Sequence, residues 1–174
     1  MKSKCTVLAL FEDESAREAA MQFCDALVER FWTEFNLQMT WARWSELEHP
    51  RLAQQTEAQA RESQIIVVAS NPKGVLPERI SWWLEAALSG RGEREGVLVG
   101  LPLAEAGISP EAAATQVYLR KLAHRHGLDY LTAVPQSLPH PETECPELYN
   151  ARATQVTSVL DKILHRSHIP PGML

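Results

Sequence analysis

Residues 63–72 read SQIIVVASNP, and this stretch decides the fold. Its apolar core, residues 65–68, has no polar residue at alternate positions, so a strand formed here would have both faces buried. Buried strands of this kind are typical of parallel sheets that lie between two layers of helices. In such sheets the functional site lies beyond the carboxyl ends of the strands. We therefore expect a central strand at residues 65–70 and any functional loop at residues 69–76.

Four further segments have the character of strands. Residues 5–11, 96–101 and 130–134 are mostly apolar, whereas Leu37, Met39 and Trp41 alternate with polar residues in the segment 37–42. The alternation places that segment at an edge of the sheet. Because helical patterns separate the strands, the sequence predicts a doubly wound, three-layer α/β/α fold with a five-stranded parallel sheet. The strand order should be 2-1-3-4-5, as in flavodoxin-like folds.

The helices are predicted from apolar residues that recur about once per helical turn. The first helix should begin with a capping box in which Ser15 is the N-cap and Glu18 reaches back to it. The residues expected to face inward are Ala16, Ala19, Ala20, Phe23, Ala26, Leu27, Val28, Phe31 and Phe35 on the first helix, Leu52, Ala53, Thr56 and Ala60 on the second, Ile80, Trp83, Leu84, Ala87 and Leu88 on the third, and Ala114, Val117, Tyr118, Leu122 and Ala123 on the fourth.

The length and composition indicate a single domain. The chain has 174 residues and a net charge of −5, and we expect one flavodoxin-like domain over residues 1–166, with a last helix near 148–165 and a tail at 167–174. The 17 basic residues are spread along the sequence, which argues against nucleic acid as a partner. No apolar run is long enough to span a bilayer, and the first apolar segment is too short for a signal peptide. We expect a cytoplasmic protein that does not bind membranes.

The predicted topology brings two loops together in one crevice. The loops after the first and third strands face each other at the point where the strand order reverses. The residues expected to line this crevice are Glu12, Asp13, Ser15, Ser70, Asn71 and Lys73.

Part of this region resembles the flavodoxins and the FMN-dependent quinone reductases. The resemblance covers Ile66–Pro72, Leu76-Pro77 and the apolar residues Ile80, Trp83 and Leu84, and it implies a strand, loop and helix that wrap a flavin ring. In these families a loop rich in Ser, Thr and Gly holds the FMN phosphate. Residues 12–14 of this chain are Glu-Asp-Glu instead, and their charges would repel a phosphate. We therefore expect no cofactor, with FMN kept as the alternative.

The acidic residues 12–14 also resemble the first loop of response-regulator receiver domains, in which carboxylates hold Mg²⁺ beside a phosphorylated Asp. Ala69, Ser70 and Asn71 supply no such Asp, so we expect no phosphotransfer and no metal site. The acidic run would then favour a helix N-terminus, with weak Mg²⁺ binding as the alternative.

No nucleophile or general base stands out. The histidines have no evident partners, and the three cysteines, Cys5, Cys24 and Cys145, have neither disulfide nor metal-site spacing. We therefore name no catalytic residue, and whether the chain is an enzyme stays open.

The tryptophans suggest an interaction surface. Trp82 and Trp83 are adjacent on one helix and about 100° apart around its axis, so both cannot face the sheet. We expect Trp82 to be partly exposed and to form a contact with a partner or a second copy of the chain, with Arg79 and Glu78 as its polar rim. The sequence thus favours a domain that acts by protein binding or self-association, for example in signalling. The alternative is an FMN-dependent oxidoreductase with an atypical phosphate loop.

Overall fold

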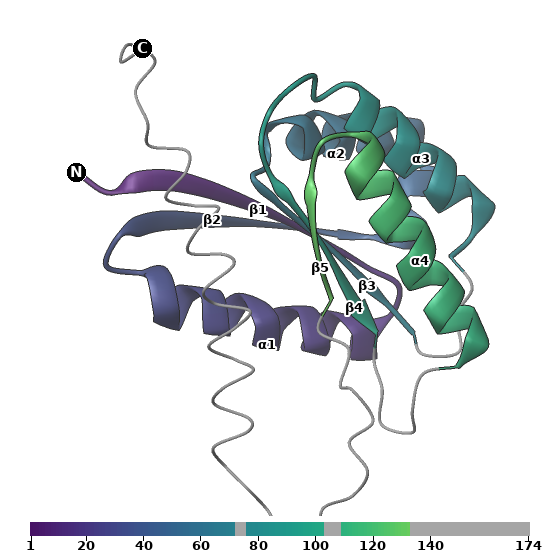
Figure 1. The fold of residues 1–174 in the computed structure, drawn as a ribbon, viewed down its shortest axis with the longest axis horizontal. Coiled ribbons are helices and arrows are strands. Elements are labelled where there is room, and N and C mark those ends of the chain that lie inside the picture. Colours follow the sequence, from purple (N-terminus) through teal and green to yellow (C-terminus); the bar gives the residue numbers. More distant parts are fainter. Residues whose placement is uncertain (72–75, 103–108, 133–174) are drawn as a thin grey trace, which may run out of the picture. The chain divides into compact units, whose positions relative to one another are not determined.

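The computed structural model describes residues 1–71, 76–102 and 109–132 of the chain (Figure 1). Residues Met1–Pro135 form one compact unit, and a second unit, Gln136–Leu174, lies outside the described residues. In chain order the elements are β1 (Ser3–Phe11), α1 (Glu14–Phe31), β2 (Phe35–Arg43), the short 3₁₀ helix η1 (Trp44–Glu48), α2 (Pro50–Glu62), β3 (Ile65–Ser70), α3 (Glu78–Ser89), β4 (Val97–Pro102), α4 (Pro110–Arg125) and β5 (Asp129–Thr132).

The strands of the described residues form one parallel sheet in the order β2-β1-β3-β4-β5. This confirms the predicted α/β fold and strand order. All six residues of β3 are buried, as expected for a central strand without alternation. Strand β2 lies at an edge, where several of its residues are exposed, so the interpretation of its alternating pattern was also right.

Helices cover both faces of the sheet. Helix α1 lies on one face, and α2, α3 and α4 lie on the other (Figure 1). The core between the sheet and these three helices includes Leu8, Leu10, Ile66, Val68 and Leu98 from the strands. Alternate residues of the central strands thus point to opposite helix layers, which explains why those strands are apolar on both sides.

The ends of the strands differ from the predicted ones because backbone pairing continues beyond the apolar core. Strand β1 begins at Ser3, which pairs with Phe35, and the ladder runs to the pair Phe11 and Arg43. Phe35 therefore starts β2. The sequence-based prediction that Phe35 belongs to the first helix was wrong. Its ring packs edge-on against Phe31, with 6.3 Å between the ring centroids. Strand β4 spans Val97–Pro102 rather than 96–101, and β5 is described as Asp129–Thr132.

The inward faces of the helices are narrower than predicted. Large exposed side chains are found at three positions that were expected to face inward, namely Val28 (41% exposed), Leu52 (40%) and Val117 (50%), and Ala26 and Ala114 are also exposed. On α4 the buried residues are Ala112, Thr115, Gln116, Leu119, Leu122 and Ala123. Two of these are polar, so the buried side of α4 could not be found from apolar spacing alone.

Gly100 in β4 is required by close packing against a buried polar pair. The Tyr130 hydroxyl of β5 donates a hydrogen bond to Gln116 Oε1 of α4 directly over this glycine. A Cβ atom at position 100 would lie 2.4 Å from Gln116 Oε1 and 2.5 Å from Tyr130 Oη. Burial raises the pKa of Tyr130 to about 12, so the hydroxyl keeps its proton at neutral pH.

Arg91 lies buried in the segment between α3 and β4, which the sequence suggested was only a polar loop. Its side chain is 4% exposed and donates hydrogen bonds to the carbonyl oxygens of Ala60, Ser63 and Glu95. The first two carbonyls lie at the C-terminal end of α2, where a cation complements the helix dipole. Burial lowers the pKa of Arg91, since it disfavours the charged form.

Several predictions fall on residues that are not described. These are the crevice residue Lys73, the helix expected near 148–165, the tail at 167–174, and the third cysteine, Cys145. The extent of the domain to residue 166 therefore stays a prediction. Among the helices that are described, none has the length and apolar character needed to cross a membrane.

Candidate functional site

The crevice predicted at the carboxyl ends of β1 and β3 exists. The two strands are paired up to Phe11 and Ala69, and the Glu12 N–H then donates to the Ala69 carbonyl oxygen at 3.1 Å. This bond keeps the segments that follow β1 and β3 side by side as they leave the sheet. Glu12, Asp13 and Asn71 are brought together there, as the topology predicted.

Asn71 binds both carboxylates of this crevice. Its backbone N–H donates to Glu12 Oε2 at 2.7 Å, and its side-chain amide donates to Asp13 Oδ2 at 3.0 Å. Each of the three residues is partly buried. Hydrogen bonds from N–H donors to a carboxylate are stronger than those between neutral groups, so these two contacts hold Asn71 firmly against Glu12 and Asp13. We call this group of residues the closed crevice, because its polar groups bind one another.

Asp13 also begins the first helix. Its backbone is extended and its Oδ1 accepts a hydrogen bond from the Ala16 N–H at 2.9 Å, which is the geometry of an N-cap. The prediction that Ser15 is the N-cap was therefore wrong. Ser15 lies in the first turn of α1 and is exposed. Both residues are of a type that caps helices, and Asp13 has the additional hydrogen bond to Asn71.

A flavin phosphate does not fit at these residues. Phosphate sites at a helix N-terminus need free backbone N–H groups and no competing negative charge. Here the Asp13 carboxylate already accepts from the first turn of α1, and Glu12 lies beside it. Of the residues that carry the flavodoxin resemblance, Pro72 lies outside the described part of the chain.

The remaining titratable groups near the sheet offer little chemistry. Among the described residues, no group of three or more acidic, His or Cys side chains is placed to hold a metal ion. Ser70 is buried, at 2% exposure. Burial raises the pKa of Cys5 to about 11 and, together with the charge of Asp25, that of Cys24 to about 12. Both thiols therefore stay protonated and unreactive at neutral pH.

Trp82 has the exposure that its helical position predicted. It is 68% exposed on α3, whereas its neighbour Trp83 is partly buried and donates from Nε1 to the Ala53 carbonyl oxygen of α2 at 3.2 Å. On the other side of α3, the Tyr118 hydroxyl of α4 donates to the Ser81 carbonyl oxygen at 3.3 Å. These two bonds join α2, α3 and α4 at the level of Trp82.

Each of these helices exposes one large apolar side chain, namely Leu52 on α2, Trp82 on α3 and Val117 on α4. We call these three exposed residues the helix-layer patch. Leu52 and Val117 were predicted to face the core, so the sequence pointed to the tryptophan but not to the other two members.

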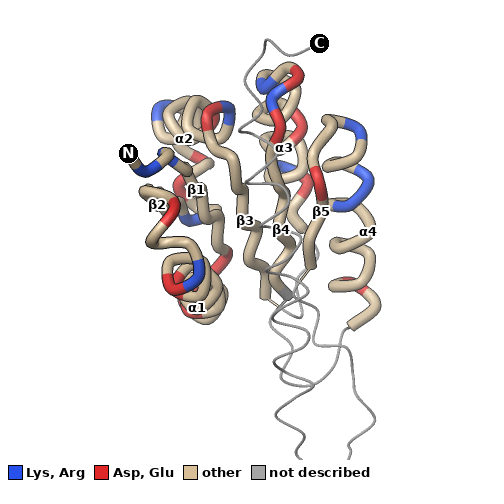
Figure 2. Tube along the Cα trace, turned by 60° about the vertical axis from the view of Figure 1, so that its left-hand side comes forward, with Lys and Arg blue, Asp and Glu red and all other residues tan. Residues whose placement is uncertain are grey.

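Charged pairs flank the helix-layer patch on both sides. Arg79, which was predicted to border Trp82, forms an ion pair with Glu48 of η1, and Arg125 of α4 pairs with Glu85 of α3 at 2.6 Å. Glu78 is exposed in the first turn of α3. Basic and acidic residues thus alternate around the patch, and Figure 2 shows charges of both signs on the same helices.

Comparisons with known proteins identify no relative by sequence, because no protein-family model and no curated protein matches the chain. Among solved structures, an azoreductase from Bacillus anthracis str. Sterne is similar, with a TM-score of 0.47 and 11% sequence identity. The similarity covers 74% of this chain and 85% of the azoreductase chain. The fold is established by the sheet itself: with its parallel strands in the order 2-1-3-4-5, the chain has a flavodoxin-like α/β fold.

Proposed function

We propose that this flavodoxin-like domain works by self-association through the helix-layer patch and not by chemistry in its crevice. The observation that carries the proposal is Trp82, which is 68% exposed on α3, while the helices α2 and α4 expose Leu52 and Val117. Tryptophan is among the residues most often found as anchors of protein interfaces.

The closed crevice supports this proposal. Both oxygens of Asp13 and one oxygen of Glu12 accept hydrogen bonds from Asn71 or from the start of α1, so these carboxylates serve to hold the fold together. The flavin-dependent oxidoreductase considered from the sequence would need a phosphate site at this place. The groups that would build it are engaged in holding β1, β3 and α1 together.

The partner to which we commit is a second copy of the chain. A two-fold contact brings the same surface to both sides, so it needs apolar groups at its centre and both signs of charge at its rim. The helix-layer patch meets this need, because Arg79 and Glu48 lie on one side of it and Arg125 and Glu85 on the other. Each rim cation of one copy can meet a rim carboxylate of the other.

The expected strength is modest. A full aromatic side chain has about 150–250 Å² of surface, and apolar burial contributes about 25 cal/mol per Å², so the exposed part of one Trp82 is worth about 3–4 kcal/mol. Two copies double this figure, and Leu52 and Val117 add to it. Association itself costs about 4–15 kcal/mol. We therefore expect a reversible dimer with a dissociation constant between micromolar and millimolar.

Sedimentation velocity tests the proposal. The wild type should shift from monomer to dimer between about 1 μM and 1 mM, which corresponds to binding free energies of about −8 to −4 kcal/mol. Trp82→Ala should stay monomeric over the same range. Trp32→Ala is the matched control, because Trp32 is also exposed, at 59%, but lies just after α1 on the other side of the sheet. A wild type that stays monomeric, or a dimer that both variants weaken equally, would refute the proposal.

A further inference from the structure

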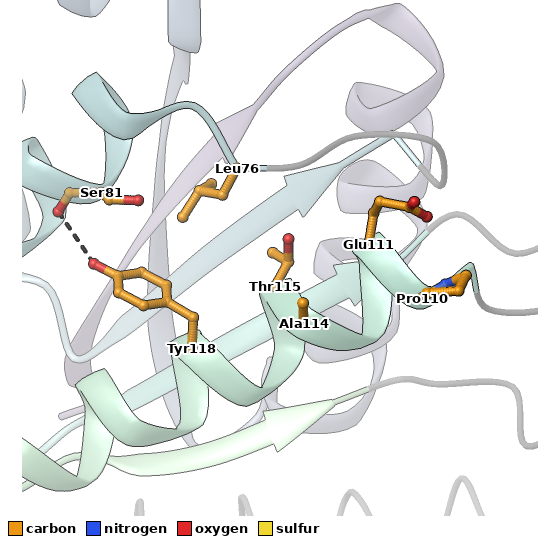
Figure 3. A pocket seen from close by; sticks show the side chains of 7 residues that line it. All are labelled: Leu76, Ser81, Pro110, Glu111, Ala114, Thr115 and Tyr118. Atoms are coloured by element: carbon orange, nitrogen blue, oxygen red, sulfur yellow. Dashed lines mark hydrogen bonds between the residues drawn. The ribbon is translucent and has the colours of Figure 1, made fainter.

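A cavity of about 430 Å³ lies between the N-terminal halves of α3 and α4. We call it the α3/α4 pocket, and Figure 3 shows its lining. The lining residues are Leu76, Ser81, Pro110, Glu111, Ala114, Thr115 and Tyr118. None of them belongs to the closed crevice or to the helix-layer patch.

Thr115 points into this pocket with an unused hydroxyl. The residue is 4% exposed, and its oxygen is directed toward Leu76 across the cavity (Figure 3). Thr115 Oγ1 forms no hydrogen bond with any described residue, in contrast to Thr56 of α2, whose hydroxyl donates to the Leu52 carbonyl oxygen at 2.8 Å. The oxygen opens into the cavity and is not one of the fully buried unpaired atoms of the described residues, so it is free to form a hydrogen bond with a ligand there.

The other polar groups of the pocket are the Ser81 hydroxyl, which can donate or accept a hydrogen bond, and the Glu111 carboxylate, which only accepts. The Ser81 hydroxyl also has no partner among the described residues, whereas the Tyr118 proton is donated to the Ser81 carbonyl oxygen. Burial raises the pKa of Tyr118, so this proton is retained at neutral pH. Glu111 is an exposed lining residue in the first turn of α4. A neutral or cationic ligand that donates a hydrogen bond suits these groups, whereas the negative charge of Glu111 repels a carboxylate or phosphate.

The apolar walls of the pocket indicate that the main part of the ligand is apolar and of limited size. Leu76, Pro110 and Ala114 are apolar, and the Tyr118 ring forms a further side of the cavity (Figure 3). Cavities of about 300–1,000 Å³ are typical of sites for small molecules, and this volume is at the low end of that range. It has room for a compound of one or two rings.

We propose that the α3/α4 pocket binds a small aromatic compound that carries an amine or a hydroxyl group, and that this group is held by the hydroxyls of Thr115 and Ser81. The ring lies against Leu76 and Tyr118. The proposal does not depend on self-association through the helix-layer patch, since the two use different residues.

Three compounds of the same size test the proposal, namely benzylamine, benzyl alcohol and benzoate. In ¹H–¹⁵N NMR spectra of the whole chain, benzylamine and benzyl alcohol should shift the amide signals of Ser81, Ala114, Thr115 and Tyr118 at millimolar concentrations. Benzoate should bind at least about tenfold more weakly, a difference of about 1.4 kcal/mol. Equal or tighter binding of benzoate, or shifts confined to other parts of the chain, would overturn the proposal.

Three variants give a second readout. Thr115→Val keeps the side-chain shape but removes the hydroxyl, and it should weaken benzylamine binding by about 3- to 10-fold, as expected for one hydrogen bond. Its thermal stability without ligand should be nearly unchanged, because the hydroxyl makes no hydrogen bond to any described residue. Ala114→Phe should fill the pocket and abolish binding, whereas Ala113→Phe, an exposed neighbour outside the lining, should not. A Thr115→Val protein that binds as tightly as the wild type, or that is clearly less stable, contradicts the role given to this hydroxyl.

Discussion

Replacing Arg91 with methionine should destabilise the fold by about 2–4 kcal/mol. Arg91 Nη1 donates to the Ala60 carbonyl oxygen at 2.6 Å and also to that of Ser63, and Nη2 donates to the Glu95 carbonyl oxygen at 3.2 Å. Methionine has a similar length but no donor, so these carbonyls would be buried without a partner. Each such loss costs about 1–3 kcal/mol, and the sum is reduced because a buried charge is also removed.

Arg94→Met is the matched control for this variant. Arg94 lies three positions along the same segment, is exposed, and makes one hydrogen bond, to the Arg61 carbonyl oxygen at 3.2 Å. Its replacement should cost less than about 1 kcal/mol. Urea unfolding followed by circular dichroism measures both values, and the melting temperature of Arg91→Met should fall by roughly 5–15 °C. If the two variants are equally stable, the buried contacts of Arg91 do not hold α2 to the segment before β4.

Three further predictions follow from the crevice and the core. Asp13→Ala should destabilise the chain by about 1–2 kcal/mol in urea unfolding, because the N-cap is lost, whereas Ser15→Ala should cost less than about 0.5 kcal/mol. Below pH 9, Cys5 and Cys24 are protonated in both the folded and the unfolded chain; the unfolded chain then releases these protons near its ordinary pKa of 9.0, while the folded chain keeps them to about 11 and 12. The free energy of unfolding should therefore fall as the pH rises from about 9 to 11, and the variant Cys5→Ala/Cys24→Ala should show a shallower fall. Purified protein should show no flavin absorption near 450 nm, and added FMN should not bind tightly, because carboxylates stand where the phosphate would lie.

Each of these three predictions has a result that contradicts it. A larger loss of stability for Ser15→Ala than for Asp13→Ala would mean that the helix starts two residues later. If the free energy of unfolding falls equally above pH 9 in the wild type and the double cysteine variant, burial does not raise the pKa values of the two thiols. Stoichiometric FMN after mild purification would show that the crevice opens to accept a phosphate.

The fold followed from short-range patterns, because those patterns report burial directly. Residues 65–68 carry apolar side chains to both faces of the sheet, so their position in the centre was readable from composition alone. The alternation of Leu37, Met39 and Trp41 likewise reported an edge strand. Regular connections between these elements left few arrangements of the strands open.

The details that the sequence did not supply depend on contacts between distant residues. Asp13 and Ser15 are equally good N-caps locally, and the bond from Asn71, 58 positions away, is a contact that only the structure shows. Leu52 and Val117 have the apolar character of core residues, but the packing of the helices leaves them 40% and 50% exposed. The sequence did contain one signal for a tight turn at Arg91, because this residue stands between Gly90 and Gly92. In the structure Gly92 has a positive φ of 64°, as such a turn requires.

Side chains that lack a partner within the chain indicate where a ligand or a second protein would bind. In the crevice, the carboxylates and the Asn71 amide satisfy one another, so a ligand there would have to replace good hydrogen bonds. In the helix layer, by contrast, an indole is exposed at Trp82, and at Thr115 a hydroxyl that opens into the α3/α4 pocket has no partner among the described residues. The two features can be separated, because Trp82→Ala should abolish the dimer and leave benzylamine binding intact, while Thr115→Val should weaken benzylamine binding by about 3- to 10-fold and leave the dimer intact. If either variant removed both properties, the dimer contact and the pocket would form a single site, and the helix layer would have one function rather than two.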